Sequence, residues 1–413
     1  MTSARSLRDR LRQQRWWGPL SVVVTVTVLA LVLLNLVAAA VLGFRGSPRR
    51  KVDPAFDRAL ALAYPDLTPS QRDRLQDEFA MTFRPTVFAQ PEERPVSGQF
   101  VTVDPAGFRR GRNQRAWPPD PESFNVFVFG GSTAFGYGVR DEDTIASHLQ
   151  AAFDASTRAR PIAVYNFARG GFYSTQERLL FDQLLTLGLR PDLAIFIDGL
   201  NEFSLVGEPP IFTRYMTEAA REDLERPLQK VIRELPIVRL LAADAGESRF
   251  ADYVRASQPA GARAARPVAD LLVARYRANQ RVIASLAEAY GVPTVFVWQP
   301  IPVYKYDLSA HPAWIDPPLL GPLHRDGYAK MRAALDAGEM DRRFVWCADI
   351  QDGKKEPFYV DQVHYNPALS KLVATCILDA LVPALGGTAK EQPGAFAAIL
   401  APGRETALPL PRD

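Results

Sequence analysis

The sequence predicts an α/β protein, a three-layer α/β/α sandwich with a central parallel sheet of about five strands, behind an N-terminal transmembrane helix. Two observations predict the sandwich. From residue 123 onward, short apolar runs alternate with amphipathic segments, and repeated βα units imply a parallel sheet wrapped by helices. The first run, Phe124 to Phe129, breaks into Gly130 and Gly131 just before Ser132. A polar side chain there would lie at the carboxyl end of a parallel strand, where open α/β sheets bind their ligands.

A third observation, the uncharged segment of residues 20–44, predicts the membrane helix. As a helix it would span about 37 Å at roughly 1.5 Å per residue, enough to cross a bilayer with some tilt. Trp16 and Trp17 lie where an aromatic belt is expected. A secretory signal peptide is the alternative, because residues 38–40 are alanines that offer a cleavage pattern, but its apolar region is normally only about 7–15 residues long. We therefore expect an uncleaved single-pass anchor over residues 19–44, after a basic tail of residues 1–18.

The charge distribution bears on orientation and on partners. The formal net charge is +3, and subtracting the +8 of residues 1–51 leaves −5 for the rest of the chain. The mildly acidic remainder gives no electrostatic support for nucleic-acid binding, so we expect no nucleic-acid partner. Five basic residues precede the apolar segment and four follow it. The positive-inside rule therefore leans toward a cytoplasmic N-terminus and a periplasmic or extracellular main body.

Residues 45–122 are expected to form a membrane-proximal connector. Thr68-Pro69-Ser70-Gln71 is typical of a helix start, and this helix is expected to run to about Phe83. Proline-rich sequence follows, and the run Trp117-Pro118-Pro119-Asp120-Pro121 resembles a boundary before the first strand. The α/β domain is then expected over residues 123–386, with a proline-rich tail over residues 387–413.

The first half of this domain reads as three strands and two helices. The strands are expected over residues 124–129, 162–167 and 193–197, and the first helix over about 144–156. Ser174 and Glu177 are spaced as a capping box, which would open a second helix that stops at Gly188. After about residue 205 the alternation lapses, and we expect a helical insertion over about 205–266.

The second half supplies two further strands and two helices. A long helix is expected over about 267–290, strands over 294–298 and 344–348, and a Pro- and aromatic-rich excursion over 300–341. Asn366 and Pro367 fit the cap and first position of a last helix, which should end near Leu381 because Pro383 disfavours helix in the residue before it. Cys347 and Cys376 have no metal-ligand spacing. The pattern favours two buried thiols, with a disulfide left open.

Polar residues recur where the predicted strands end, and each has a role in acyl transfer. A serine hydroxyl, here Ser132, needs a base, and a neutral imidazole suits that task near pH 7. His364 lies three residues after Asp361, so one turn of chain can bring the carboxylate to the ring, where it would fix the tautomer. A glycine amide near Gly171, the Ser132 amide and the Asn201 side chain could converge on an oxyanion.

The loop at Ser132 also allows other interpretations. A phosphate loop would carry Lys followed by Ser or Thr after the glycines, and none is present. An α/β-hydrolase nucleophile elbow would carry Gly two residues after the serine, where this chain has Ala134. A plain glycine turn with a surface serine remains the alternative for this loop taken alone.

Taken together, four blocks resemble the SGNH (GDSL-like) hydrolase family, named for its Ser, Gly, Asn and His. They are Gly130-Gly131-Ser132, Asn166 to Gly171, Gly199-Leu200-Asn201-Glu202, and Asp361-Gln362-Val363-His364. Gly131 stands where many members have Asp, and Glu202 replaces the final Asp of the third block. The resemblance covers about residues 123–385, interrupted by the insertion, and implies an SGNH/flavodoxin-like fold.

The resemblance implies a serine esterase that cleaves carbohydrate or lipid esters outside the cytoplasm, attached to the membrane by its N-terminal helix. Ser132 would be the nucleophile, His364 the base and Asp361 its orienting acid, with Ser132, Gly171 and Asn201 as oxyanion donors. No metal or organic cofactor is implied. Two alternatives stay open: an O-acyltransferase that modifies a cell-envelope polysaccharide with the same site, and a non-catalytic glycan-binding or assembly module.

Other polar and aromatic residues have more ordinary explanations. Arg169 is expected to be solvated, although it could touch substrate, and His148 is expected on a helix surface. His311 and His324 could line the rim of a pocket, with a structural or exposed role as the default. Four aromatic residues suit a sugar-stacking wall, yet core packing explains them equally well: Trp298, Tyr304, Tyr306 and Trp314.

Overall fold

The computed structural model describes most of the chain. The described residues are 4–45, 54–79, 83–84, 92–155, 160–204, 232, 235–242, 262–314 and 319–384. Most of the predicted insertion and the whole of the predicted tail after residue 386 lie outside these ranges.

A five-stranded sheet is the centre of the fold, and every strand pairing in it is parallel. Its order is β6-β5-β7-β8-β9. The chain passes from β5 to β6 on one side and then to β7 on the other, so a crevice is expected beyond the carboxyl end of β5. The predicted parallel sheet is confirmed, with strands β5 (Phe124–Gly130), β6 (Ile162–Asn166), β7 (Leu193–Asp198), β8 (Thr294–Trp298) and β9 (Phe344–Trp346).

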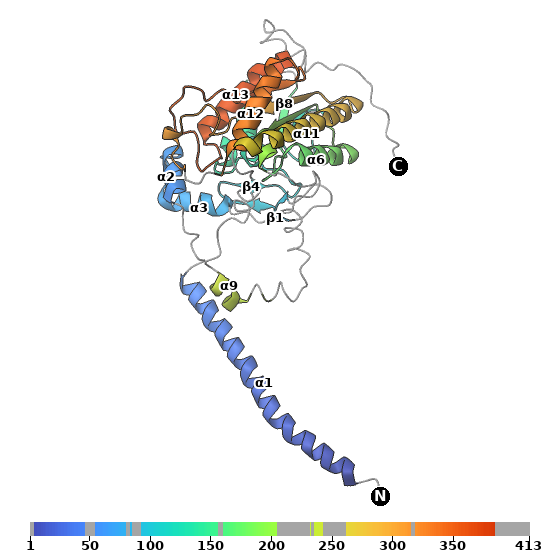
Figure 1. Cartoon of the computed structure of the whole chain (residues 1–413), viewed down its shortest axis with the longest axis vertical. Coiled ribbons are helices and arrows are strands. Elements are labelled where there is room, and N and C mark those ends of the chain that lie inside the picture. The colour runs from blue at the N-terminus through green and yellow to red at the C-terminus, as the bar shows by residue number, and fades with distance from the viewer. Residues whose placement is uncertain are drawn as a thin grey trace. The chain divides into compact units, whose positions relative to one another are not determined.

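Two helical layers cover the two faces of the sheet, which confirms the predicted sandwich. Successive side chains of β5 point to opposite faces, as the pleat of a strand requires. Phe127 and Phe129 join a core with α6 (Ser174–Thr186), α11 (Ala262–Ala289) and α12 (Pro322–Asp336). Val126 and Val128 join another with α5 (Ile145–Asp154) and α13 (Pro367–Ala384). Figure 1 shows α11 and α12 packed side by side.

The segment before β5 forms several short elements within the same compact unit as the sheet. The predicted helix from Thr68 is α3, and it ends at Phe79 rather than near Phe83. Arg109 is fully buried and donates a backbone hydrogen bond to Asn166 at the edge of the sheet. The elements are α2 (Pro54–Ala63), α3 (Pro69–Phe79), β1 (Phe83–Arg84), β2 (Glu92–Glu93), β3 (Val96–Ser97) and β4 (Thr102–Val103).

The predicted start of α6 and the predicted end of the last helix are also wrong. Ser174 is the first residue of α6 and not its cap, because the side chain of Gln176 accepts the backbone N–H of Tyr173 instead. Glu177 is buried rather than reaching back to the helix start.

The last helix runs on to Ala384, past Pro383. Pro383 lacks the N–H that would bond the carbonyl four residues earlier, but it is the next-to-last residue of the helix, so little of the helix is left to disrupt. The cap itself is confirmed, since Asn366 Oδ1 accepts the Leu369 amide at 2.9 Å.

The two cysteines form a disulfide, so the prediction of two free thiols is wrong. Cys347 follows β9 and Cys376 lies in α13, with their Cα atoms 6.0 Å apart. The spacing of 29 residues carried no information about this pairing. The sheet and the helix packed on it bring the two residues together.

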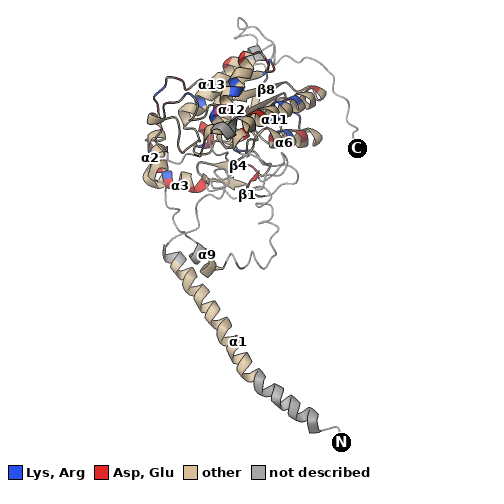
Figure 2. Ribbon diagram, viewed as in Figure 1, with Lys and Arg blue, Asp and Glu red and all other residues tan. Residues whose placement is uncertain are grey.

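The N-terminal helix belongs to a second unit, which also contains residues 224–248. Helix α1 (Ala4–Arg45) includes Gly18–Val41, which is long and apolar enough to cross a membrane by length and composition. It is uncharged along this part (Figure 2). A short helix from the predicted insertion, α9 (Pro236–Ala242), packs on α1, and Ile237 donates its amide to the Asn35 side chain at 3.2 Å. An anchor and a signal sequence share these properties, and the membrane assignment therefore rests on the apolar helix alone.

Candidate active site

Ser132 lies directly beyond the carboxyl end of β5, as the sequence predicts. Gly131 is the extended residue before α4 (Ser132–Phe135), so Ser132 occupies the first helical position. An amide at that position has no acceptor within its own helix and stays available to an anion. The β5 strand is buried on both faces, which fixes the loop that carries the hydroxyl.

His364 and Asp361 meet Ser132 across the carboxyl edge of the sheet. The Nε2 atom of His364 lies 2.8 Å from Ser132 Oγ, and its Nδ1 atom lies 2.6 Å from Asp361 Oδ2. The other Asp361 oxygen accepts the backbone amides of Val363 and His364 at 2.9 and 2.8 Å. The turn of chain between Asp361 and His364 therefore holds the carboxylate within hydrogen-bond distance of the imidazole.

The Asp361 carboxyl is held in its ionised form. Burial would raise its pKa, but the charge and hydrogen bond of His364 and the two backbone amides lower the pKa of Asp361 to about 2. Because the folded pKa is below the ordinary value, this stabilisation is present above about pH 4 and lost as the pH falls toward 2. The side chain retains 36% exposure, so water screens part of the interaction.

The predicted oxyanion donors border the same loop. Asn201 follows β7 at the start of a 3₁₀ turn, Asn201–Phe203, and its Nδ2 donates one hydrogen bond to Phe172 O at 2.8 Å. The amide nitrogen carries a second hydrogen that this contact does not use. Gly171 has a φ of +76°, and no atom lies within 4 Å of the place where a Cβ would stand. Among the described residues, no acceptor takes the Gly171 amide.

The structure gives a steric reason for glycine at position 131, where many members of the family have Asp. A Cβ at residue 131 would lie 2.4 Å from Asn201 Nδ2 and 3.0 Å from Phe172 O. A larger side chain would displace the Asn201 amide group from the loop. The absence of a side chain at Gly131 thus lets the first and third blocks approach each other closely.

The other residues named from the sequence have structural partners of their own, although His311 lies next to the turn that carries Asp361. Arg169 is buried and pairs with Glu92 at 2.8 Å, so the expectation of a solvated arginine is wrong. His311 and His324 are buried, and burial lowers their pKa values to about 4 and about 3. His148 is half-buried on α5. Of the aromatic residues, Trp298 and Tyr306 are core residues, and Tyr304 packs against the core.

Two residues near the site were missed by sequence reasoning. Tyr137 stacks its ring on that of His364, with centroids 5.4 Å apart and planes 22° apart. Glu93 is buried and accepts the backbone N–H of Gly170 at 2.7 Å. Neither belongs to a motif, and only the distance of five residues from Ser132 could have drawn attention to Tyr137.

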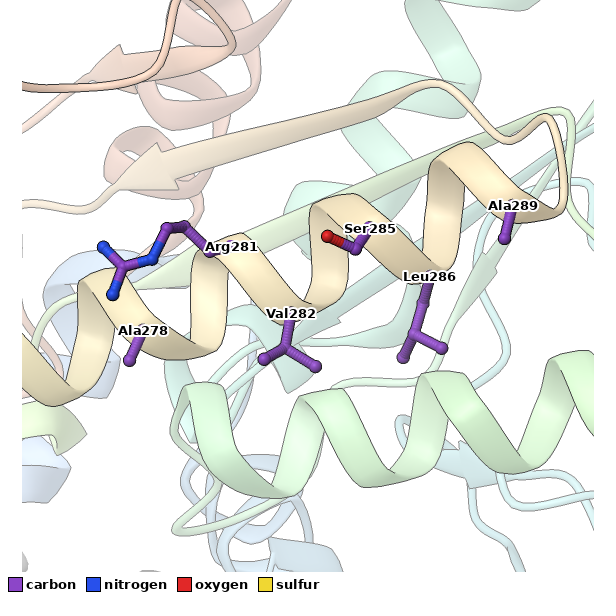
Figure 3. A pocket seen from close by; sticks show the side chains of 6 residues that line it. All are labelled: Ala278, Arg281, Val282, Ser285, Leu286 and Ala289. Carbon is purple, nitrogen blue, oxygen red and sulfur yellow. The ribbon is translucent and has the colours of Figure 1, made fainter.

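A shallow hollow elsewhere on the unit contains none of these residues. It measures about 450 Å³ and is lined by α11 alone. Figure 3 shows Val282 and Leu286 pointing toward the neighbouring helix, with Arg281 on the other side of α11. Within the described ranges, no group of three or more His, Cys, Asp or Glu side chains is arranged to hold a metal ion.

A parallel α/β sheet with serine, histidine and aspartate hydrogen-bonded in series at its carboxyl edge has the architecture of a serine-dependent acyl hydrolase. Residues 128–324 match the model of the GDSL-like lipase/acylhydrolase family. This match confirms the resemblance to the family for the first three of the four blocks. His364 and Asp361 lie beyond the matched residues. Among curated proteins, none matches the chain.

Several solved structures are similar to the chain. The psychrotrophic esterase EstA from Pseudoalteromonas sp. is 14% identical, with 63% of this chain and 97% of that one covered and a TM-score of 0.33. The lipase/acylhydrolase from Enterococcus faecalis is 10% identical, with 61% and 92% covered and a TM-score of 0.33. A member of the lipolytic G-D-S-L family from Veillonella parvula is 11% identical, with 62% and 96% covered and a TM-score of 0.32.

Proposed function

We propose that this protein is a membrane-anchored serine esterase that removes acyl groups from carbohydrate or lipid esters outside the cytoplasm. The observation that carries the proposal is the unbroken series of hydrogen bonds from Ser132 through His364 to Asp361. Esterase or acylhydrolase chemistry is that of the family whose model the chain matches. Substrate, triad and location go beyond that family assignment.

Acylation begins at Ser132. Its Oγ atom attacks the ester carbonyl carbon while His364 Nε2 takes the hydroxyl proton, and the carbonyl electron pair moves onto oxygen. The Ser132 and Gly171 amides and the second Asn201 hydrogen would stabilise this oxyanion. The intermediate then expels the alkoxide, which receives the proton from His364, and an acyl ester remains on Ser132.

Deacylation repeats these steps with water. His364 takes a proton from the water molecule as its oxygen attacks the acyl carbon, and the second tetrahedral intermediate expels Ser132 Oγ. The proton returns to the serine, and the carboxylic acid leaves. Throughout, Asp361 holds the Nδ1–H tautomer and stabilises the transient positive charge on the ring.

The site geometry disfavours a non-catalytic role. A module that only retained the fold would have no need for the Ser132 hydroxyl within hydrogen-bond distance of a histidine that is itself paired with an ionised carboxylate. The proposal is tested by incubating the full-length protein in detergent with a fluorophosphonate probe and with short-chain aryl esters. Labelling of Ser132 and ester turnover are expected, and an unlabelled, inactive protein would overturn the proposal.

Loss of the Asn201 side chain tests the oxyanion assignment. We expect Asn201→Ala to lower kcat by about 10²–10³, the size typical of one lost donor, with a smaller effect on KM. Steady-state kinetics on an aryl ester measure this change. Asn279→Ala, which removes an amide bonded to Ser174 and Thr175 away from the triad, serves as control. A loss of less than about tenfold for Asn201→Ala would mean that its amide does not face the oxyanion.

The location outside the cytoplasm has two supports. The apolar helix Gly18–Val41 could anchor the chain, and the Cys347–Cys376 disulfide suits an oxidising compartment. We therefore expect a C-terminal fusion to alkaline phosphatase, which needs disulfides, to be active in a bacterial host. An inactive fusion alongside an active cytoplasmic reporter would reverse the orientation. A mature N-terminus near Val41 would show that the helix is a cleaved signal.

A further inference from the structure

Two adjacent glutamates from outside the matched domain are buried against the loop that carries Gly171. Glu92 and Glu93 form strand β2, in the segment before β5, and are 6% and 2% exposed. Buried carboxylates are costly unless they are paired or hydrogen-bonded. Their partners lie in the loop after β6: Glu92 pairs with the Arg169 guanidinium and Glu93 accepts the Gly170 amide.

The Gly170 contact fixes which way the loop amides point. Its N–H donates to Glu93 Oε1 at 2.7 Å and is therefore occupied. The amide of Gly171, one peptide further on, is the one without an acceptor among the described residues. Glu93 therefore holds one amide of the pair and leaves the other free for an oxyanion.

The same oxygen atom also contacts a tyrosine that packs against the proposed base. Tyr137 donates its hydroxyl hydrogen to Glu93 Oε1 at 3.2 Å, and its ring stacks on His364. The Tyr137 backbone is in turn bonded to Ser132 O at 3.0 Å. Glu93 thus bridges the oxyanion loop and the aromatic ring that lies against the base.

We infer that Glu93 is a positioning residue of the active site, which sets the Gly170–Gly171 amides and the Tyr137 ring relative to Ser132 and His364. This inference rests on the proposed esterase function and extends the working site into the segment before the α/β domain. Glu93 touches no reacting atom. It acts through Gly170 and Tyr137.

The test compares turnover per active site in the full-length protein. We expect Glu93→Ala to lower kcat by about 10²-fold with KM nearly unchanged, because misplacement of a donor by about 1 Å costs that much. Burst titration with a fluorophosphonate counts the competent sites, so a loss of folded protein lowers the burst and not kcat per titrated site. Glu93→Gln keeps an acceptor oxygen and should recover most of the rate.

Two further variants keep the outcome decisive. Tyr137→Phe removes only the hydroxyl that reaches Glu93, and we expect it to lower kcat by less than Glu93→Ala does. It also provides a measurable loss of kcat if the alanine variant does not fold. Glu78→Gln is the matched control: Glu78 also accepts loop amides, those of Gln99, Phe100 and Val101, but contacts none of the site residues. It should leave kcat per titrated site unchanged.

The possible results separate the two proposals. The role of Glu93 would be overturned if the wild type is active and Glu93→Ala has the same kcat per titrated site. If Glu93→Ala does not fold, the same kcat in Tyr137→Phe would overturn it. In both cases the proposed esterase function would stand. A wild type without labelling or turnover would overturn the proposed function, and the role of Glu93 with it. A large loss of kcat with full recovery in Glu93→Gln would support the inference.

Discussion

Ser132→Ala is expected to abolish ester turnover, with a loss of at least about 10⁴-fold in kcat, because removal of the nucleophile leaves only binding and the oxyanion donors. The substitution removes one oxygen atom from a half-buried position, so the fold should be retained. Aryl-ester turnover measures kcat, probe labelling reports whether the reactive serine is lost, and a thermal unfolding curve reports whether the fold is retained.

Ser204→Ala is the matched control for this experiment. Ser204 Oγ also lies within hydrogen-bond distance of a histidine, 3.2 Å from His324 Nε2, but that histidine is fully buried. Substrate cannot reach a fully buried pair, and labelling should therefore persist in the control. Unchanged turnover in Ser132→Ala would remove the serine from the mechanism.

Asp361→Asn has the second-largest expected effect, a loss of about 10⁴-fold in kcat. Asparagine keeps the shape of the side chain but offers the histidine a different set of donors and acceptors, so the ring is no longer held with its proton on Nδ1. The expected signature is a low kcat with a native unfolding temperature. Since the pKa of Asp361 is lowered to about 2, any loss of activity between pH 5 and 7 in the wild type arises from another group.

The control for Asp361→Asn is Asp341→Asn. Asp341 likewise accepts the backbone amide two residues ahead, that of Arg343 at 2.8 Å, but it lies in the turn before β9. Asp341→Asn removes a carboxylate that holds a turn but leaves the contact between Asp361 and His364 in place. Equal effects of the two substitutions would mean that Asp361 stabilises its turn and does not orient His364.

The sheet was predictable because its strands are buried on both faces and read as continuous apolar runs, bounded by glycine and proline. The contact between Ser132 and His364 was predictable for a related reason. The carboxyl ends of parallel strands share one edge, so polar residues that follow different strands meet there. The site roles themselves remain predictions, whereas the positions of these side chains are now known.

The remaining features depend on contacts between distant parts of the chain. Glu177 has the spacing of a cap, but its side chain is buried, and Tyr173 and Gln176 form the start of α6 instead. Nothing near Glu93 in the sequence indicates that Gly170 will lie against it, since the two are 77 residues apart. The Cys347–Cys376 pairing likewise depends on how α13 packs on β9. Such contacts have no local signature.

The disulfide divides the proposed catalytic residues into two topological classes. Asp361 and His364 both lie between Cys347 and Cys376, on a covalently closed ring of chain, whereas Ser132, Gly171 and Asn201 lie outside it. In the unfolded chain a ring of this size loses about 3–4 kcal/mol of conformational freedom, which favours the folded arrangement of the acid and base. The proposed base and its orienting acid therefore lie on a segment that the disulfide closes, and we expect reduction of the disulfide to destabilise that segment.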